Sequence, residues 1–234
     1  MVISILPLSA VYHKIGEYGT PSYALSVTVS NNIAYVAAWD AGLQIIDISN
    51  PQNPSLLGSY DTPDYANYVV MSDNIVYVAG GESGLLIVDV TNPENPFLLS
   101  SYYTTGSAFS VDFYNSIAYV ANGWAGLQII DVSNPENPSL LGSYDTPDWA
   151  YSVFVSNNIA YVADGWAGLQ IIDVSNPQNP VLLVSYDTPR YAESVTVSNN
   201  IAYVADGWAG LQIIDVTNPQ NPFILGSYHT PYYA

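Results

Sequence analysis

A phrase close to Gly-Leu-Gln-Ile-Ile-Asp-Val-Ser-Asn-Pro recurs five times in this chain of 234 residues. Its aspartate returns every 42 residues, at Asp47, Asp89, Asp131, Asp173 and Asp215. A fixed period of about 40 residues indicates a propeller or an array, in which each unit buries its surface against its neighbours. The period therefore predicts one stacked body and not several independent domains.

The fourth copy shows what one unit contains. Short β-branched and aromatic runs at 150–155, 159–163, 169–174 and 181–186 are separated by segments rich in Asn, Gly, Asp and Pro. Runs of this kind are typical of strands, and the prolines in 175–180 forbid ladder pairing there. The second and third runs are apolar on both faces, as expected of sheets covered on both sides. We therefore predict an all-β fold, a β-propeller of five four-stranded antiparallel blades.

The complete units run over 16–57, 58–99, 100–141, 142–183 and 184–225 of a single domain, and leave terminal segments at 1–15 and 226–234. Residues 11–20 resemble one more fourth strand, so the chain holds six copies of that strand and five of each other strand. One terminal copy can close a ring of five blades, which is the arrangement we favour. Alternatively, the chain forms part of a larger or oligomeric ring, and a spare terminal strand offers a route to a homo-oligomer.

The phrases at 85–90, 127–132 and 169–174 resemble the LVIVD repeat. The Ile-Ala-Tyr-Val-Ala run that precedes two of them is similar to the related YVTN-type surface repeats. The resemblance covers residues 16–234. It implies a β-propeller of a kind frequent in bacterial and archaeal surface proteins, and it supplies no catalytic residues.

Charge narrows the class of partner. Lys14 and Arg190 stand against 20 acidic residues, which gives a formal net charge of −18. Nucleic acid binding needs clustered Lys and Arg, so we expect no nucleic acid partner. No apolar run is long enough to insert into a membrane. Scarce lysine with abundant Asn, Ser and Tyr favours an extracellular or cell-surface protein, although residues 1–10 lack the basic start of a signal peptide.

Two sets of loops carry the candidate ligand-binding residues. Antiparallel strand order places the loop between the second and third strands at the same end of a blade as the loop that leads into the first strand. Repetition then predicts a ring of aromatic and polar side chains, suited to neutral sugars or to a protein interface. Its members are Trp124, Trp166, Trp208, Asn122, Asp164 and Asp206 from the former loop, and Tyr65, Trp149 and Tyr191 from the latter. In the alternative interpretation the tryptophans pack between blades, and the acids and Asn122 cap their own glycine turns.

The five periodic aspartates are interpreted as structural turn residues, because each can accept hydrogen bonds from the backbone amides that follow it. A ring of five blades would hold these carboxylates too far apart for the roughly 2.3–2.6 Å contacts of one Ca²⁺ ion. Cysteine is absent, which excludes thiolate metal sites. We therefore predict no metal and no cofactor.

Catalytic patterns are also missing. His13 and His229 fall near outer strands, and the most divergent copy, the second, offers only Glu82 and Asp73. The chain is predicted to be a non-enzymatic binding or scaffold propeller that mediates protein–protein interaction or assembly at a microbial surface. The alternative is a multivalent, lectin-like propeller that binds carbohydrate through the aromatic and acidic ring.

Overall fold

The computed structural model describes residues 14–234. These form five four-stranded antiparallel sheets, each built from strands consecutive in the chain, which confirms the predicted blades. The strands are β1 (Ser26–Ser30), β2 (Ile33–Ala37), β3 (Leu43–Asp47) and β4 (Ser55–Tyr60); β5 (Tyr68–Ser72), β6 (Ile75–Ala79), β7 (Leu85–Asp89) and β8 (Phe97–Tyr102); β9 (Ser110–Tyr114), β10 (Ile117–Ala121), β11 (Leu127–Asp131) and β12 (Ser139–Tyr144); β13 (Ser152–Ser156), β14 (Ile159–Ala163), β15 (Leu169–Asp173) and β16 (Val181–Tyr186); β17 (Ser194–Ser198), β18 (Ile201–Ala205), β19 (Leu211–Asp215) and β20 (Phe223–Tyr228).

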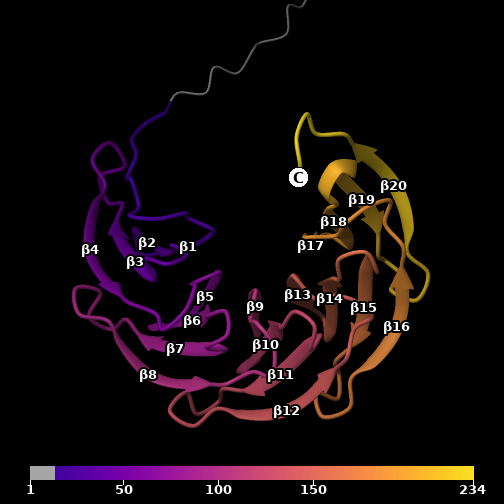
Figure 1. The fold of residues 1–234 in the computed structure, drawn as a ribbon, viewed down its shortest axis with the longest axis horizontal. Helices are drawn as coiled ribbons and strands as arrows, with labels where there is room; N and C mark the ends of the chain where they lie inside the picture. The colour runs from indigo at the N-terminus through magenta and orange to yellow at the C-terminus, as the bar shows by residue number, and fades with distance from the viewer. Residues whose placement is uncertain (1–13) are drawn as a thin grey trace, which may run out of the picture.

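The blades follow one another around an arc, with the first strand of each blade innermost and the fourth outermost (Figure 1). In the part of the chain that the structure describes, the one helical element is a 3₁₀ turn, η1 (Gly207–Ala209), and no helix is long and apolar enough to cross a membrane. The first blade runs over residues 26–60, and the other blades run over the equivalent residues. The sequence units that start at 16 and 58 therefore begin inside or beside a fourth strand and not between two blades.

Turn chemistry explains the hairpins. Asn157 and Asn158 join β13 to β14 with φ of 52° and 61°. Asparagine tolerates this left-handed region better than most residues, and a two-residue turn with both φ values positive matches the twist of the flanking strands. Gly168, with φ of 74°, precedes β15, and a Cβ there would collide with the Tyr186 carbonyl oxygen. The repeated Asn and Gly positions thus fix the register of each blade.

Two faces of each blade build the core. The forward face, turned toward the next blade in the chain, carries Tyr35, Ala37, Leu43 and Ile45 in the first blade. The backward face, turned toward the preceding blade, carries Val69, Val76, Val78, Leu86 and Val88 in the second. These nine residues form one buried cluster, and equivalent clusters fill the other three seams.

The five blades form an open arc. Figure 1 shows the fifth blade standing apart from the first, and among residues 14–234 no buried cluster joins them. On the backward face of the first blade, Val27 and Val29 are 60% and 58% exposed, whereas their counterparts Val153 and Val155 are buried. The expectation of a closed five-blade ring is therefore wrong for the described residues.

The segment before β1 also differs from expectation. Residues 14–20 are not a strand, because no third strand lies beside them to complete a ladder, and residues 11–13 lie outside the described residues. The segment nevertheless holds a fourth strand's place. A Cβ on Gly16 would collide with the Pro51 carbonyl oxygen, as one on Gly58 would with that of Pro93. Tyr18 packs on the backward face of the first blade, as Tyr60 packs on that of the second.

Candidate functional site

Exposed aromatic side chains gather at one end of the blades, and we call this set the aromatic rim. Trp124, Trp166 and Trp208 come from the loop between the second and third strands and are 58%, 65% and 64% exposed. They do not pack between blades. Trp149, Tyr191 and Tyr233 come from the loop that leads into the next first strand, and each is also exposed or partly exposed. The two loop sets meet, as their antiparallel order predicts.

Two aromatic pairs within the rim repeat the same geometry. Trp166 and Tyr191 meet edge to face, with ring centroids 5.3 Å apart and an interplanar angle of 79°. Trp208 and Tyr233 meet at 5.4 Å and 85°. In both pairs the tryptophan comes from one blade and the tyrosine from the segment that follows it. Together with Arg190 the four rings line a hollow of about 350 Å³.

The rim continues inward through a chain of stacked and bonded rings. Tyr191 donates a hydrogen bond through its hydroxyl to the Tyr151 hydroxyl, at 2.8 Å. Tyr151 lies 5.1 Å from Phe109 and 6.2 Å from Trp149, measured between ring centroids. Tyr233 donates to a Glu193 carboxylate oxygen at 2.8 Å. These contacts restrict the side chains of the rim, so less side-chain conformational entropy is lost when a partner binds.

The first blade carries a variant of the rim. Trp39 occupies the place that Gly165 has in the fourth blade, and its φ of 47° is unusual for a bulky side chain. Its backbone pairs with Ala66, as Gly165 pairs with Ala192. The Trp39 ring stacks on Tyr65 with centroids 4.5 Å apart, and Tyr23 meets it edge-on. Trp39 is thus one position out of phase with the other loop tryptophans.

The polar members of the predicted ring lie elsewhere. Asn122, Asp164 and Asp206 are fully buried, so they do not present oxygens on the surface beside the tryptophans. Asp164 accepts a hydrogen bond from Asp148 N at 3.2 Å. Asp206 accepts from Arg190 N at 3.0 Å and from the Thr188 hydroxyl at 2.8 Å. Asp164 and Asp206 thus connect their own blade to the loop that enters the next blade. The prediction that they form an exposed acidic ring for sugar hydroxyls is wrong.

Burial governs the charge of these two acids. Desolvation raises the pKa of Asp164 and of Asp206, although the hydrogen bonds from Asp148 N and Arg190 N act in the opposite direction. Asn122 fills the same place in the third blade without a charge. With its amide oriented to suit its neighbours, Oδ1 accepts from Gly106 N at 2.9 Å and Nδ2 donates to Thr104 Oγ1 at 2.8 Å.

The five periodic aspartates lie at the opposite end of the blades and close turns. Each accepts a hydrogen bond through Oδ1 from the backbone amide two residues later, with distances of 2.7–2.9 Å. Hydrogen bonds from Ser49, Ser133 and Ser175 lower the pKa of Asp47, Asp131 and Asp173. The arrangement stabilises the turn that precedes the Asn-Pro loop.

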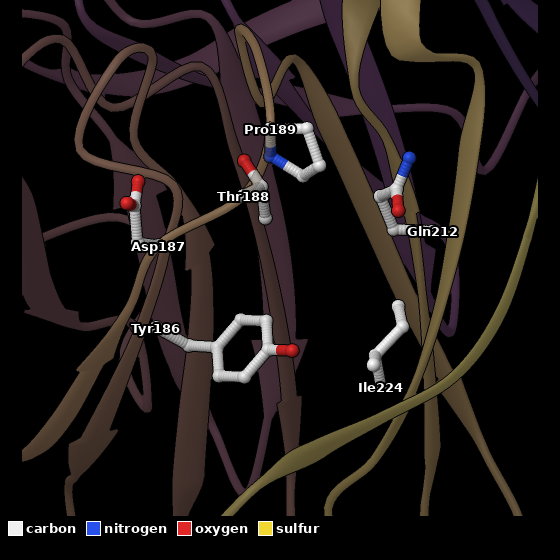
Figure 2. A pocket seen from close by; sticks show the side chains of 6 residues that line it. All are labelled: Tyr186, Asp187, Thr188, Pro189, Gln212 and Ile224. Atoms are coloured by element: carbon white, nitrogen blue, oxygen red, sulfur yellow. The ribbon is translucent and has the colours of Figure 1, made fainter.

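Other hollows lie away from the rim, and two of them bear on function. One, of about 310 Å³, follows the seam between the fourth and fifth blades, where Tyr186 from the end of β16 and Ile224 from β20 face each other (Figure 2). The other lies among the innermost strands and is lined by Asp112, whose pKa is raised by burial. Asp112 accepts backbone hydrogen bonds from Val155 and Phe113, and no other acid and no histidine lines that hollow.

No group of three or more His, Cys, Asp or Glu side chains in residues 14–234 is placed to hold a metal ion. His229 is exposed on the outer side, and His13 falls outside the described residues. Glu82 donates its backbone amide to Asp64 at 2.7 Å in a turn, as Trp166 does to Asp148.

Sequence reasoning missed Arg190, Phe109 and Tyr151 as neighbours of the rim. Phe109 and Tyr151 stand two residues after the rim position in the entering loop, a place occupied by Leu25, Asn67 and Glu193 in other blades. Because this position varies between copies, the repeat alone carried no signal for it. Arg190 could have been found as the one basic residue in any of these loops.

Comparisons with known proteins agree with the geometry. The LVIVD repeat matches this chain five times, at 21–62, 63–104, 105–146, 149–188 and 189–230. A search of curated proteins finds no match. Solved structures share the fold at low identity. A functionally unknown protein from Desulfotomaculum acetoxidans DSM 771 has a TM-score of 0.73 and 13% identity, over 91% of this chain and 72% of that chain.

Two more solved structures extend the likeness. The WD40 beta propeller domain of Doa1 gives a TM-score of 0.71 at 11% identity, over 92% of this chain and 72% of that chain. The computationally designed Ika8 protein gives 0.60 at 12%, over 91% and 77%. At these identities the likeness concerns the fold alone, whereas the five repeat matches extend over most of the sequence. The chain therefore belongs to the LVIVD repeat family.

Proposed function

We propose that this chain is a non-enzymatic binding and scaffold module that engages a protein partner through its aromatic rim, at a microbial cell surface. One observation carries the proposal: Trp124, Trp166 and Trp208 come from equivalent loops of three blades, lie at the same end of those blades and are each more than half exposed. Tryptophan and tyrosine are enriched at the centres of protein interfaces because they offer large, rigid contact areas. Tryptophans that are more than half exposed contribute little to the buried core between blades.

The electrostatics of the rim favour a basic or neutral partner. Asp145 and Asp148 border Trp124 and Trp149, and Glu193 is bonded to Tyr233, whereas Arg190 is the one cation in the region. The whole chain carries −18. A partner with Lys or Arg at its contact surface would be steered toward the rim and would find ring faces for cation–π contacts.

A neutral glycan is the second candidate. The observation that favours it is the repeated edge-to-face pair, Trp166 with Tyr191 and Trp208 with Tyr233. An edge-on tyrosine leaves the tryptophan face open for the C–H face of a sugar ring, and two equal weak sites gain strength through avidity. Because Asp164 and Asp206 are buried, the rim lacks a full set of sugar-binding groups. We therefore rank a protein partner ahead of a glycan.

One experiment separates the two candidates. The wild-type chain and a triple variant, Trp124→Ser, Trp166→Ser and Trp208→Ser, are assayed for binding to immobilised microbial envelope fractions. The control is Leu56→Ser, Phe97→Ser and Leu140→Ser, which removes comparably exposed apolar residues from outer strands. We expect the rim variant alone to lose binding, and protease treatment of the envelope to abolish it. Loss after periodate oxidation instead would support the glycan, and equal binding by all three proteins would contradict both.

The cell-surface location has its own test. Its support is compositional, since the chain has scarce lysine and abundant Asn, Ser and Tyr. Antibody labelling of intact source cells should reach the protein without permeabilisation. Labelling only after permeabilisation would contradict the cell-surface location, and the proposal that the aromatic rim binds a partner would be unaffected.

A further inference from the structure

One hollow of the aromatic rim has aromatic walls and a single basic side chain. Arg190 lines this hollow of about 350 Å³ together with Trp166, Tyr191, Trp208 and Tyr233. Trp166 belongs to the fourth blade and Trp208 to the fifth, and Arg190 lies in the loop that connects these two blades. Trp166 is 65% exposed although the fifth blade stands beside it, so the packing of the two blades leaves the hollow open.

The guanidinium of Arg190 makes no ion pair within residues 14–234, although the chain carries 20 acidic residues. Two acids of this region are engaged in other contacts. Asp206 accepts hydrogen bonds from Arg190 N and from the Thr188 hydroxyl. Glu193 accepts one from the Tyr233 hydroxyl. A guanidinium presents a planar fork of N–H donors that matches a carboxylate, so the fork of Arg190 is available to a carboxylate from another molecule.

The place of Arg190 holds a carboxylate in two other blades. Asp148 accepts a hydrogen bond from Trp166 N, and Asp64 accepts one from Glu82 N, each at 2.7 Å. Both aspartates follow a Thr-Pro pair, as Arg190 does. In these two blades the chain itself thus supplies the carboxylate that the exposed loop amide needs.

The fifth blade lacks that carboxylate. A Cβ on Gly165 would meet an Asp148 oxygen, whereas the atoms that a Cβ on Gly207 would meet first belong to the Tyr233 ring. Trp208 follows Gly207 as Trp166 follows Gly165. Beside Trp208 there is therefore a cation and an aromatic wall where the fourth blade has an anion.

We propose that this hollow binds the C-terminal carboxylate of the protein partner, with the partner's last side chain against the aromatic rings. The inference rests on the proposed function, because it specifies which part of the partner the rim receives. Arg190 offers the carboxylate a pair of charge-assisted hydrogen bonds, and the four rings offer apolar contact in the same small space. A C-terminal residue fits because it carries a carboxylate and a side chain on one carbon atom, which an internal Asp or Glu does not.

The neighbouring hollow of the rim has the opposite polarity. It measures about 510 Å³, and its lining includes Trp124 and Trp149 with Asp145 and Asp148. Asp148 there takes the place that Arg190 has in the first hollow. Carboxylates among aromatic rings suit Lys or Arg side chains. A partner segment that ends at Arg190 and is neutral or basic before its last residue therefore matches both hollows.

The test begins with the wild-type chain and a peptide array. Hexapeptides with varied last residues are immobilised through their N-termini, each as a free acid and as a C-terminal amide. We expect binding to free acids that end in an aromatic or aliphatic residue. The amides should bind about tenfold more weakly, because they lose a charge-assisted contact. This comparison changes the peptide and leaves the protein intact, so it does not depend on whether a variant folds.

A pair of variants tests the role of the guanidinium. Arg190→Gln should bind free acids and amides equally, at the level of the amides. Lys14→Gln is the matched control, because it makes the same change in charge at an exposed site in the segment before β1, and it should keep the preference for free acids. In ¹⁵N spectra the indole signals of Trp166 and Trp208 should shift with the best free-acid peptide, and that of Trp39 should not. Circular dichroism checks that both variants are folded.

The outcomes separate this inference from the proposed function. Equal binding of acids and amides by wild type, an unchanged preference in Arg190→Gln, or no bound peptide would overturn the carboxylate site. Binding of glucuronic acid on a glycan array in place of any peptide would also overturn it, in favour of an acidic glycan. If Arg190→Gln binds the envelope fraction as wild type does, whereas the triple tryptophan variant does not, the rim remains the binding surface and the carboxylate site alone fails.

Discussion

Ile129 and Ile213 occupy the same place in the third strand of their blades, yet only Ile129 is covered by a neighbouring blade. The two residues share their sequence context and their pairing, opposite Tyr119 and Tyr203. They differ in what lies across the seam. This makes them a matched pair for measuring what a blade contact contributes.

We predict that Ile129→Ala lowers the free energy of unfolding by about 2–5 kcal/mol, because it opens a cavity in a sealed seam. Ile213→Ala should lower it by roughly 1 kcal/mol or less in dilute protein, because water already reaches that face. Urea unfolding at submicromolar concentration measures both. Equal losses would mean that the fifth blade is covered in the dilute monomer.

A second prediction concerns the buried charge of Asp164. Its Oδ1 has no hydrogen-bond donor, because the Thr146 hydroxyl donates to the Asp148 carbonyl oxygen, whereas Asn122 fills the same place with its donors and acceptors matched. Asp164→Asn should therefore stabilise the fold by about 1 kcal/mol at pH 7, since it removes an unsatisfied buried acceptor and a desolvated charge. The exposed Asp145→Asn is the control, with no comparable gain expected.

The pH dependence of that gain has a fixed sign. Burial raises the pKa of Asp164 in the folded state above its unfolded value, so ionisation opposes folding. The penalty is absent below the unfolded pKa of about 3.9 and grows as pH rises through the raised folded value. The advantage of Asp164→Asn should thus shrink as pH falls from 7 toward 4, measured by denaturant unfolding at each pH. An advantage that grows in acid would contradict the assignment.

The period of 42 predicted the blades, their strands and the ends at which loops meet, because each unit must hide both faces against its like. It could not predict the open arc, since closure depends on the angle between blades and not on the pattern within one. The burial of Asp164 and Asp206 was also missed. Each of these aspartates precedes a Gly-Trp pair in its loop, and this sequence is the same whether the aspartate side chain points outward or into the neighbouring loop.

Trp39 shows a second limit. Its loop, Ala38-Trp39-Asp40-Ala41-Gly42, has the same length as Asp164-Gly165-Trp166-Ala167-Gly168, but the tryptophan stands one place earlier. Aligned by residue type, the two tryptophans look equivalent. Aligned by backbone, Trp39 takes the positive φ of a glycine and lies against Tyr65. Only the conformation of the turn separates the two alignments.

A third prediction concerns the paired rings of the rim. Trp166 with Tyr191 and Trp208 with Tyr233 have nearly equal geometry. Double-mutant cycles with alanine should therefore give similar coupling energies, about 0.5–1.5 kcal/mol each. Thermal unfolding of the single and double variants provides the measurement. A coupling in one pair alone would show that the rim sites are not equivalent, and would weaken the case for a multivalent ligand.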